Sequence, residues 1–200
     1  KQKTAYEIPK RDWSSDVCSS DLDLNLGGDP DPYITFGAVG AALTDWERFE
    51  GHLALIFTAL IGLGDEAHAA RRAYGTIAAF QGRAGMVRAA AEAYFDEHPD
   101  PDLQKDLADL LNTASRASAR RNEIAHGVVQ PIDPSKTVFT GGRYTLVPAY
   151  YATNKRDLRH QARYSYAAVE IQRFARQFDE LVEPALALLD RIHARHPQGS

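Results

Sequence analysis

Four stretches of the chain place apolar residues at alternating spacings of three and four, the pattern of a helix that buries one face. The first stretch has its apolar positions at Ala42, Trp46, Phe49, Leu53, Ile56, Leu60 and Leu63. The second covers residues 67–95, the third residues 103–124, and the fourth runs from Lys155 to Ile192. Because each apolar face needs another to cover it, the pattern predicts an all-α fold, a four-helix up-down bundle.

Glycine and proline indicate where these helices begin and end. Glycines within Gln81–Gly85 each weaken a helix by about 1 kcal/mol relative to alanine, so we expect the second stretch to break there. Asp100 and Pro101 are typical of a helix cap and first turn and predict the start of the third helix. Gly127 offers a left-handed residue to end that helix, and Pro184 should kink the fourth mildly.

Between the third and fourth stretches the pattern changes to that of strands. Thr137–Thr140 and Arg143–Val147 are rich in β-branched and aromatic residues, and they flank Gly141 and Gly142, a typical tight turn. We therefore expect a short β-hairpin inserted between the third and fourth helices.

Residues 1–22 follow none of these patterns. They resemble the in-frame translation of a short-read sequencing adapter, so we expect them to lie outside the fold and the native start of the protein to be missing. The segment 23–34 is rich in Gly, Asp and Pro and should form a leader or loop. Residues 35–200 would then form one helical domain.

Composition narrows the possible chemistry. The formal net charge is -4, which argues against strong non-specific binding to nucleic acid and leaves only a local basic patch for RNA. The one cysteine, Cys18, lies in the adapter-like segment, so we expect no disulfide, no thiolate nucleophile and a cytoplasmic location. No histidine cluster has metal-ligand spacing, and no apolar run reaches the ~18 residues of a membrane span. We expect no metal, cofactor or membrane contact.

The end of the third stretch carries the strongest candidate chemistry. Residues 121–127 read Arg-Asn-Glu-Ile-Ala-His-Gly. Arg121 can hold a phosphate in bidentate fashion, and His126 can move a proton near neutral pH. Asn122 lies four residues before His126 and therefore on the same helix face. The three residues together predict phosphoryl-transfer chemistry that needs no metal.

Arg121 also falls on the apolar face of the third helix, where an unpaired charge would be costly. We predict that it faces inward and pairs with Glu50 of the first helix, and Glu47 is the alternative partner. Such a pair is compatible with a purely structural role for Arg121. His126 in the last helical turn is also consistent with a structural role, as a cation that complements the helix dipole.

This motif resembles the signature of the HEPN superfamily, in which Arg, a polar residue often Asn, and His lie on the third helix of a bundle. Arg121, Asn122 and His126 match it residue by residue, and the run from Trp46 to Leu53 resembles the first helix of bacterial members. The resemblance implies metal-independent RNA cleavage, with His126 as proton-transfer group, Arg121 stabilising the phosphorane and Asn122 orienting either group. It also implies a homodimer in which two motifs share a cleft.

The dimer has a second, geometric argument. At ~100° per residue, Arg121 and His126 are about 140° apart around the helix, so one protomer should close poorly on a phosphate. Further cations could form a basic RNA-binding rim or simply a solvated helix face: Arg116, Arg120, Lys155, Arg156, Arg159 and Arg163. The pairs Tyr150-Tyr151 and Tyr164-x-Tyr166 are better explained by packing than by base stacking.

Two functions are therefore open. One is a HEPN-type endoribonuclease, a toxin or defence effector with a cognate antitoxin protein. The other is a non-catalytic bundle that binds a protein or a nucleotide. A basic cleft around His126 would favour the first, and burial of both Arg121 and His126 within one protomer would favour the second.

Overall fold

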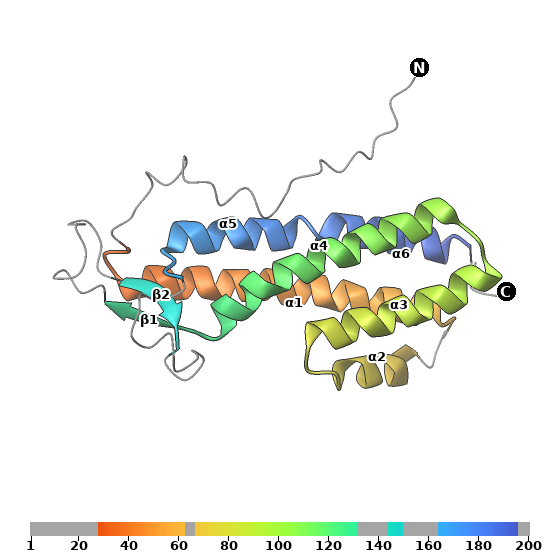
Figure 1. The fold of residues 1–200 in the computed structure, drawn as a ribbon, viewed down its shortest axis with the longest axis horizontal. Coiled ribbons are helices and arrows are strands. Elements are labelled where there is room, and N and C mark those ends of the chain that lie inside the picture. Colours follow the sequence, from red (N-terminus) through yellow and green to blue (C-terminus); the bar gives the residue numbers. More distant parts are fainter. Residues whose placement is uncertain (1–27, 63–66, 132–143, 150–163, 196–200) are drawn as a thin grey trace, which may run out of the picture.

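The computed structural model describes residues 28–62, 67–131, 144–149 and 164–195 and confirms an all-α bundle with a short hairpin (Figure 1). The helices are α1 (Pro32–Leu60), α2 (Ala67–Gly75), α3 (Phe80–Glu97), α4 (Pro101–Ala125), α5 (Ala168–Asp179) and α6 (Val182–His193). The strands are β1 (Gly127–Pro131) and β2 (Tyr144–Pro148), and they lie between α4 and α5 as predicted.

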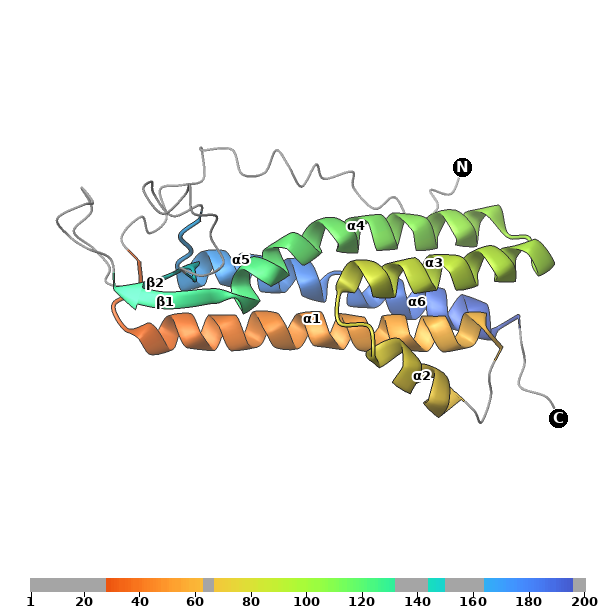
Figure 2. The same ribbon diagram turned by 60° about the horizontal axis from the view of Figure 1, so that its bottom comes forward.

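Four long rods form the bundle: α1, α3, α4, and α5 followed by α6 (Figures 1 and 2). From α1 to α5 successive helices alternate in direction, and α6 continues in the direction of α5, so that among the four rods α4 runs opposite to the others. The short helix α2 lies outside the bundle against α1, and it carries the chain back along α1 before α3 begins. As a consequence α1 and α3 run the same way, and the start of α3 lies beside the middle of α1.

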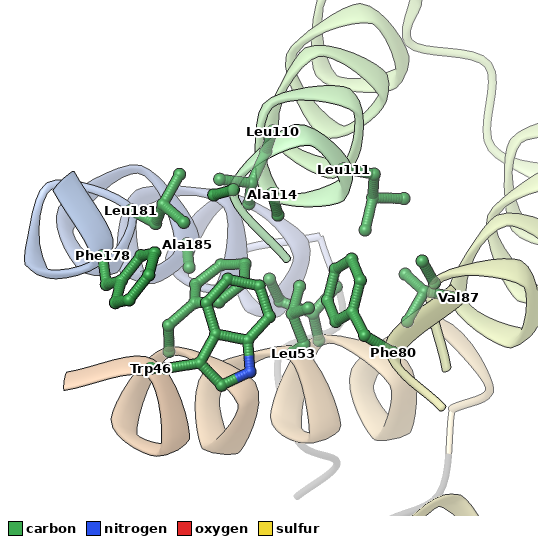
Figure 3. Close-up of a cluster of buried hydrophobic side chains, with 14 of the residues drawn as sticks. Trp46, Leu53, Phe80, Val87, Leu110, Leu111, Ala114, Phe178, Leu181 and Ala185 are labelled. Carbon is green, nitrogen blue, oxygen red and sulfur yellow. The ribbon is translucent and has the colours of Figure 1, made fainter. Parts of the chain in front are cut away.

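The core is built around Trp46 of α1 (Figure 3). Its indole is fully buried and meets Phe49, Phe80 and Phe178 edge to face, with ring centroids 5.6, 5.0 and 5.3 Å away. Such pairs add about 0.5–1.5 kcal/mol each beyond the burial of apolar area. Because the rings come from α1, α3 and α5, this cluster fixes three rods relative to one another.

Two aspartates start the long helices. Asp100 caps α4 as predicted, with its carboxylate accepting from the Leu103 amide across 3.0 Å. Asp31 caps α1, and Pro32 occupies the first turn. The helix therefore begins inside the segment 23–34 that was expected to be a leader or loop, where the Asp-Pro signal outweighs the later glycines of α1.

Proline and glycine break the helices at other points than expected. The break before α3 lies at residues 76–79 and not at Gln81–Gly85, so Gly82 and Gly85 are helical. Pro184 does more than kink the last helix, because α5 ends at Asp179 and α6 begins at Val182. Proline has no amide proton for the carbonyl of residue 180, and its ring crowds that carbonyl.

The hairpin differs from the predicted one in its first strand. β1 is Gly127–Pro131, earlier in the chain than the expected strand, and it pairs antiparallel with β2, Gly127 opposite Pro148 and Pro131 opposite Tyr144. The expected turn at 141–142 and the expected first strand lie outside the described residues, as do residues 1–22.

The free edge of β2 ties two distant segments to the hairpin. Tyr144 makes a single bridge with Asp29, and Leu146 makes one with Tyr166. Asp29 is buried, and its carboxylate accepts from the Thr35 hydroxyl and the Ala168 amide, across 2.6 and 2.8 Å. Residues 164–167 are thus not helical, and α5 begins at Ala168. The prediction of a continuous fourth helix from Lys155 is therefore wrong. In the part of the chain that the structure describes, no helix has the length and apolar character to cross a membrane.

Candidate functional site

Arg121 lies on the inner face of α4, in line with the buried residues Leu103, Leu107, Leu110, Ala114 and Ala117. Its side chain is 25 % exposed, so the prediction that it faces inward is confirmed. The guanidinium donates from Nη2 to Glu47 Oε1 across 3.1 Å and from Nη1 to Asn122 Oδ1 across 3.2 Å. Its Nε is buried and makes no hydrogen bond within the described part of the chain.

The prediction that Arg121 pairs with Glu50 is wrong. Its buried carboxylate accepts a hydrogen bond from the Trp46 indole across 2.8 Å and forms an ion pair with Arg83 of α3. Arg83 also donates to the carbonyl of Ile77 across 2.7 Å. Glu50 therefore joins α1 to α3 within the core, and the supporting acid of Arg121 is Glu47, one turn earlier on α1.

An open cleft of about 340 Å³ between α3 and α4 brings the three motif residues together. Its lining consists of Ala78, Ala79, Phe80, Gln81, Ser118, Arg121, Asn122 and His126. His126 and Asn122 are exposed, and the backbone amide of His126 donates to the Asn122 carbonyl across 3.0 Å as the last bond of α4. One protomer thus places Arg121 and His126 at the same cleft, which removes the geometric argument that a single motif closes poorly.

Gly127 fixes the chain directly after His126, although not as a left-handed cap. The cap residue is His126 itself, with φ -107° and ψ 6°, and Gly127 opens β1. A Cβ at Gly127 would lie 2.6 Å from Leu146 Cγ and 3.0 Å from the Glu123 carbonyl oxygen. Glycine is needed here because the hairpin packs directly against the end of α4.

The far side of the last turn of α4 is anchored through Glu123. Its carboxylate accepts from Arg120 and from the Tyr166 hydroxyl, across 2.6 and 2.7 Å, and its carbonyl accepts from the Tyr164 hydroxyl across 2.9 Å. Burial, followed by the bond to Glu123, raises the pKa of Tyr166 well above its usual range. The two tyrosine rings stack with centroids 4.9 Å apart, which makes them packing residues.

Neither Arg116 nor Arg120, the described members of the predicted RNA-binding rim, lines the cleft. Arg120 is bound to Glu123 and Tyr166 on the far side of α4, so it does not face the cleft. Arg116 is exposed and donates to Thr113 across 3.3 Å, but it does not line the cleft. Lys155, Arg156 and Arg159, with Arg163, lie outside the described residues.

Sequence reasoning missed the wall opposite the motif, residues 78–81. No side chain caps α3 at Ala79, so the positive end of the helix dipole lies at this wall. Gln81 follows, and its amide donates weakly to the Ser118 hydroxyl across 3.4 Å. The glycines within Gln81–Gly85 predicted a helix break near this point. That predicted break was the available sequence signal for this wall of the cleft.

No group of three or more His, Cys, Asp or Glu side chains suited to a metal ion occurs among the residues that the structure describes. In comparisons with known proteins, the chain matches no protein-family model, no curated protein and no solved structure. Its function is therefore inferred from the cleft and from the resemblance of the motif.

Proposed function

We propose that this protein is a metal-independent endoribonuclease of HEPN type. The observation that carries the proposal is the meeting of Arg121, Asn122 and His126 at one open cleft. A guanidinium can stabilise the charge that develops in phosphodiester cleavage by an internal hydroxyl, an imidazole can transfer the proton, and an amide can orient the groups. The solvent-accessible position of His126 further supports an active rather than a buried structural role.

The reaction is attack by a ribose 2′-hydroxyl on the adjacent phosphorus. The new P–O2′ bond replaces the P–O5′ bond and leaves a 2′,3′-cyclic phosphate and a 5′-hydroxyl. His126 accepts the proton of the 2′-hydroxyl, and the departing 5′ oxygen takes a proton from water that reaches the open cleft. Arg121 offsets the charge of the phosphorane. Asn122, which accepts a hydrogen bond from Arg121 across 3.2 Å, orients His126 or the phosphate.

A second function is supported by the Arg121–Glu47 pair. A guanidinium that already has a carboxylate partner at 3.1 Å is also what a non-catalytic bundle would contain. In that case the cleft would bind a nucleotide or a protein without cleaving it. The pair does not prevent catalysis, because a phosphate can compete for a guanidinium whose partner is 59 % exposed.

We further propose a cytoplasmic homodimer that acts as a toxin or defence effector and is restrained by an antitoxin protein. The resemblance of the motif supports the role as a toxin or defence effector and the restraint by an antitoxin. Exposed aromatic residues at the start of α1, Tyr33 at 77 % and Phe36 at 51 %, support a dimer. Sedimentation at micromolar concentration should show a dimer, and a monomer at all concentrations would contradict this part.

The test compares three oligonucleotides of one mixed sequence, incubated with purified protein and EDTA. RNA should be cleaved to products ending in 2′,3′-cyclic phosphate. DNA and 2′-O-methyl RNA should stay intact, because neither has the attacking hydroxyl. Absence of cleavage across several RNA sequences would favour the binding function, and cleavage of DNA would contradict the mechanism.

A further inference from the structure

The two walls of the α3–α4 cleft differ in chemistry. The α4 wall presents Arg121, Asn122 and His126, a set suited to a phosphate. The opposite wall, residues 78–81, presents the exposed Ala78 and Ala79 beside the largely buried Phe80, with Gln81 as its single polar side chain. An apolar surface beside one amide is the combination that holds a planar base and reads its edge.

The amide of Gln81 is placed to do this. It is exposed, and its contact with Ser118 at 3.4 Å is long for a hydrogen bond. Ser118 is buried and already donates to the Ser115 carbonyl across 2.8 Å. The Oε1 of Gln81 makes no hydrogen bond to any described residue, so the amide retains both an acceptor and a donor for a ligand.

The spacing of the two chemistries along α4 fits one nucleotide. Ser118, which marks the Gln81 end, precedes Asn122 by four residues and His126 by eight. At about 1.5 Å per residue these separations are ~6 and ~12 Å along the helix axis. A phosphate between Arg121 and His126 therefore leaves its own sugar and base within reach of Gln81.

We propose that Gln81 is a specificity-determining residue that hydrogen-bonds the edge of the nucleobase whose 3′-phosphate lies at Arg121 and His126. This rests on the proposed function, since it concerns the same cleft. An amide offers one donor beside one acceptor, which matches a base edge of mixed pattern. A carboxylate at the same place would offer two acceptors, which match the two adjacent donors N1–H and N2–H of guanine.

The experiment measures the binding of the four nucleoside 3′-monophosphates to wild type, Gln81→Glu and Gln104→Glu. Position 81 is in the first turn of α3, where a carboxylate suits the helix dipole, so the variant should fold. Gln104 is an exposed residue near the start of α4, far from the cleft, and its variant carries the same change of charge. The measured quantity is the ratio of guanosine to adenosine 3′-phosphate affinity, in which a general loss from added negative charge cancels.

We expect Gln81→Glu to raise this ratio on the order of 10-fold, since a bidentate pair discriminates by ~1–3 kcal/mol. Gln104→Glu should leave the ratio within twofold of wild type. An unchanged ratio in Gln81→Glu, or no binding of any nucleotide to wild type at millimolar concentration, overturns the inference. A shifted ratio in a protein that cleaves no RNA would retain this base subsite and refute the ribonuclease, so the two failures are distinguishable.

Discussion

Arg121 of α4 donates to Glu47 of α1 across 3.1 Å, while Glu50, one turn further along the same helix, is held by Arg83 of α3. The two acids differ sharply in environment. The Glu47 side chain is 59 % exposed and that of Glu50 is 5 % exposed. α1 thus provides one acid for the candidate site and one for the core.

The first prediction compares Glu50→Gln with Glu47→Gln. The first variant leaves the charge of Arg83 buried without a counter-charge, so it should lower the free energy of unfolding by about 3 kcal/mol. The second breaks a solvent-screened pair and should cost less than about 1 kcal/mol. Urea unfolding of both variants measures this, and equal losses would mean that the two ion pairs are assigned wrongly.

The second prediction concerns the contact between Gly127 and Leu146. The added methyl group of Gly127→Ala meets the buried Leu146 side chain and should destabilise the protein by about 1–3 kcal/mol. In a Leu146→Ala background the side-chain clash is absent, and the cost of the glycine change should fall by on the order of 1 kcal/mol. Additive losses in this double-mutant cycle would show that the clash is not the cause.

The third prediction is a pH dependence at Asp100. The hydrogen bond from the Leu103 amide, with the guanidinium of Arg195, holds the pKa of Asp100 below its usual range. A carboxyl with a lowered folded pKa contributes stability above its unfolded pKa of about 3.9, and this contribution is lost as the pH falls through the folded pKa.

Asp100→Asn keeps a side chain that can cap the helix but has no charge. It should therefore be less stable than wild type at pH 7, and the difference should shrink as the pH falls below about 4. Chemical unfolding at several pH values measures the difference. A difference that stays constant down to pH 3 would show that the charge of Asp100 plays no part.

Much of the fold follows from the spacing of apolar residues. The apolar face of α1 from Ala42 to Leu60 is buried as the pattern predicts, and so is that of α4. The cap at Asp100 is equally local, because it needs only an acid before a proline. Features of this kind are set by residues within one or two turns of each other.

The predictions failed where a contact with a segment distant in the sequence determines the structure. Glu47 and Glu50 lie three residues apart on α1, and the position of Arg83 on α3 determines which acid is left for Arg121. From the sequence Gly127 was expected to be a helix cap, but glycine is needed there because a larger residue would clash with the side chain of Leu146. The cleft wall with Gln81 depends on how α3 meets α4, which no local pattern contains.

The most direct test of the central claim is the rate of RNA cleavage in EDTA by wild type, His126→Ala and His193→Ala. His193 is an exposed residue at the end of α6, so its variant controls for loss of an imidazole elsewhere. We predict that wild type and His193→Ala cleave alike and that His126→Ala, still folded by circular dichroism, is slower on the order of 10²–10⁴-fold. Equal cleavage by wild type and His126→Ala would contradict the account.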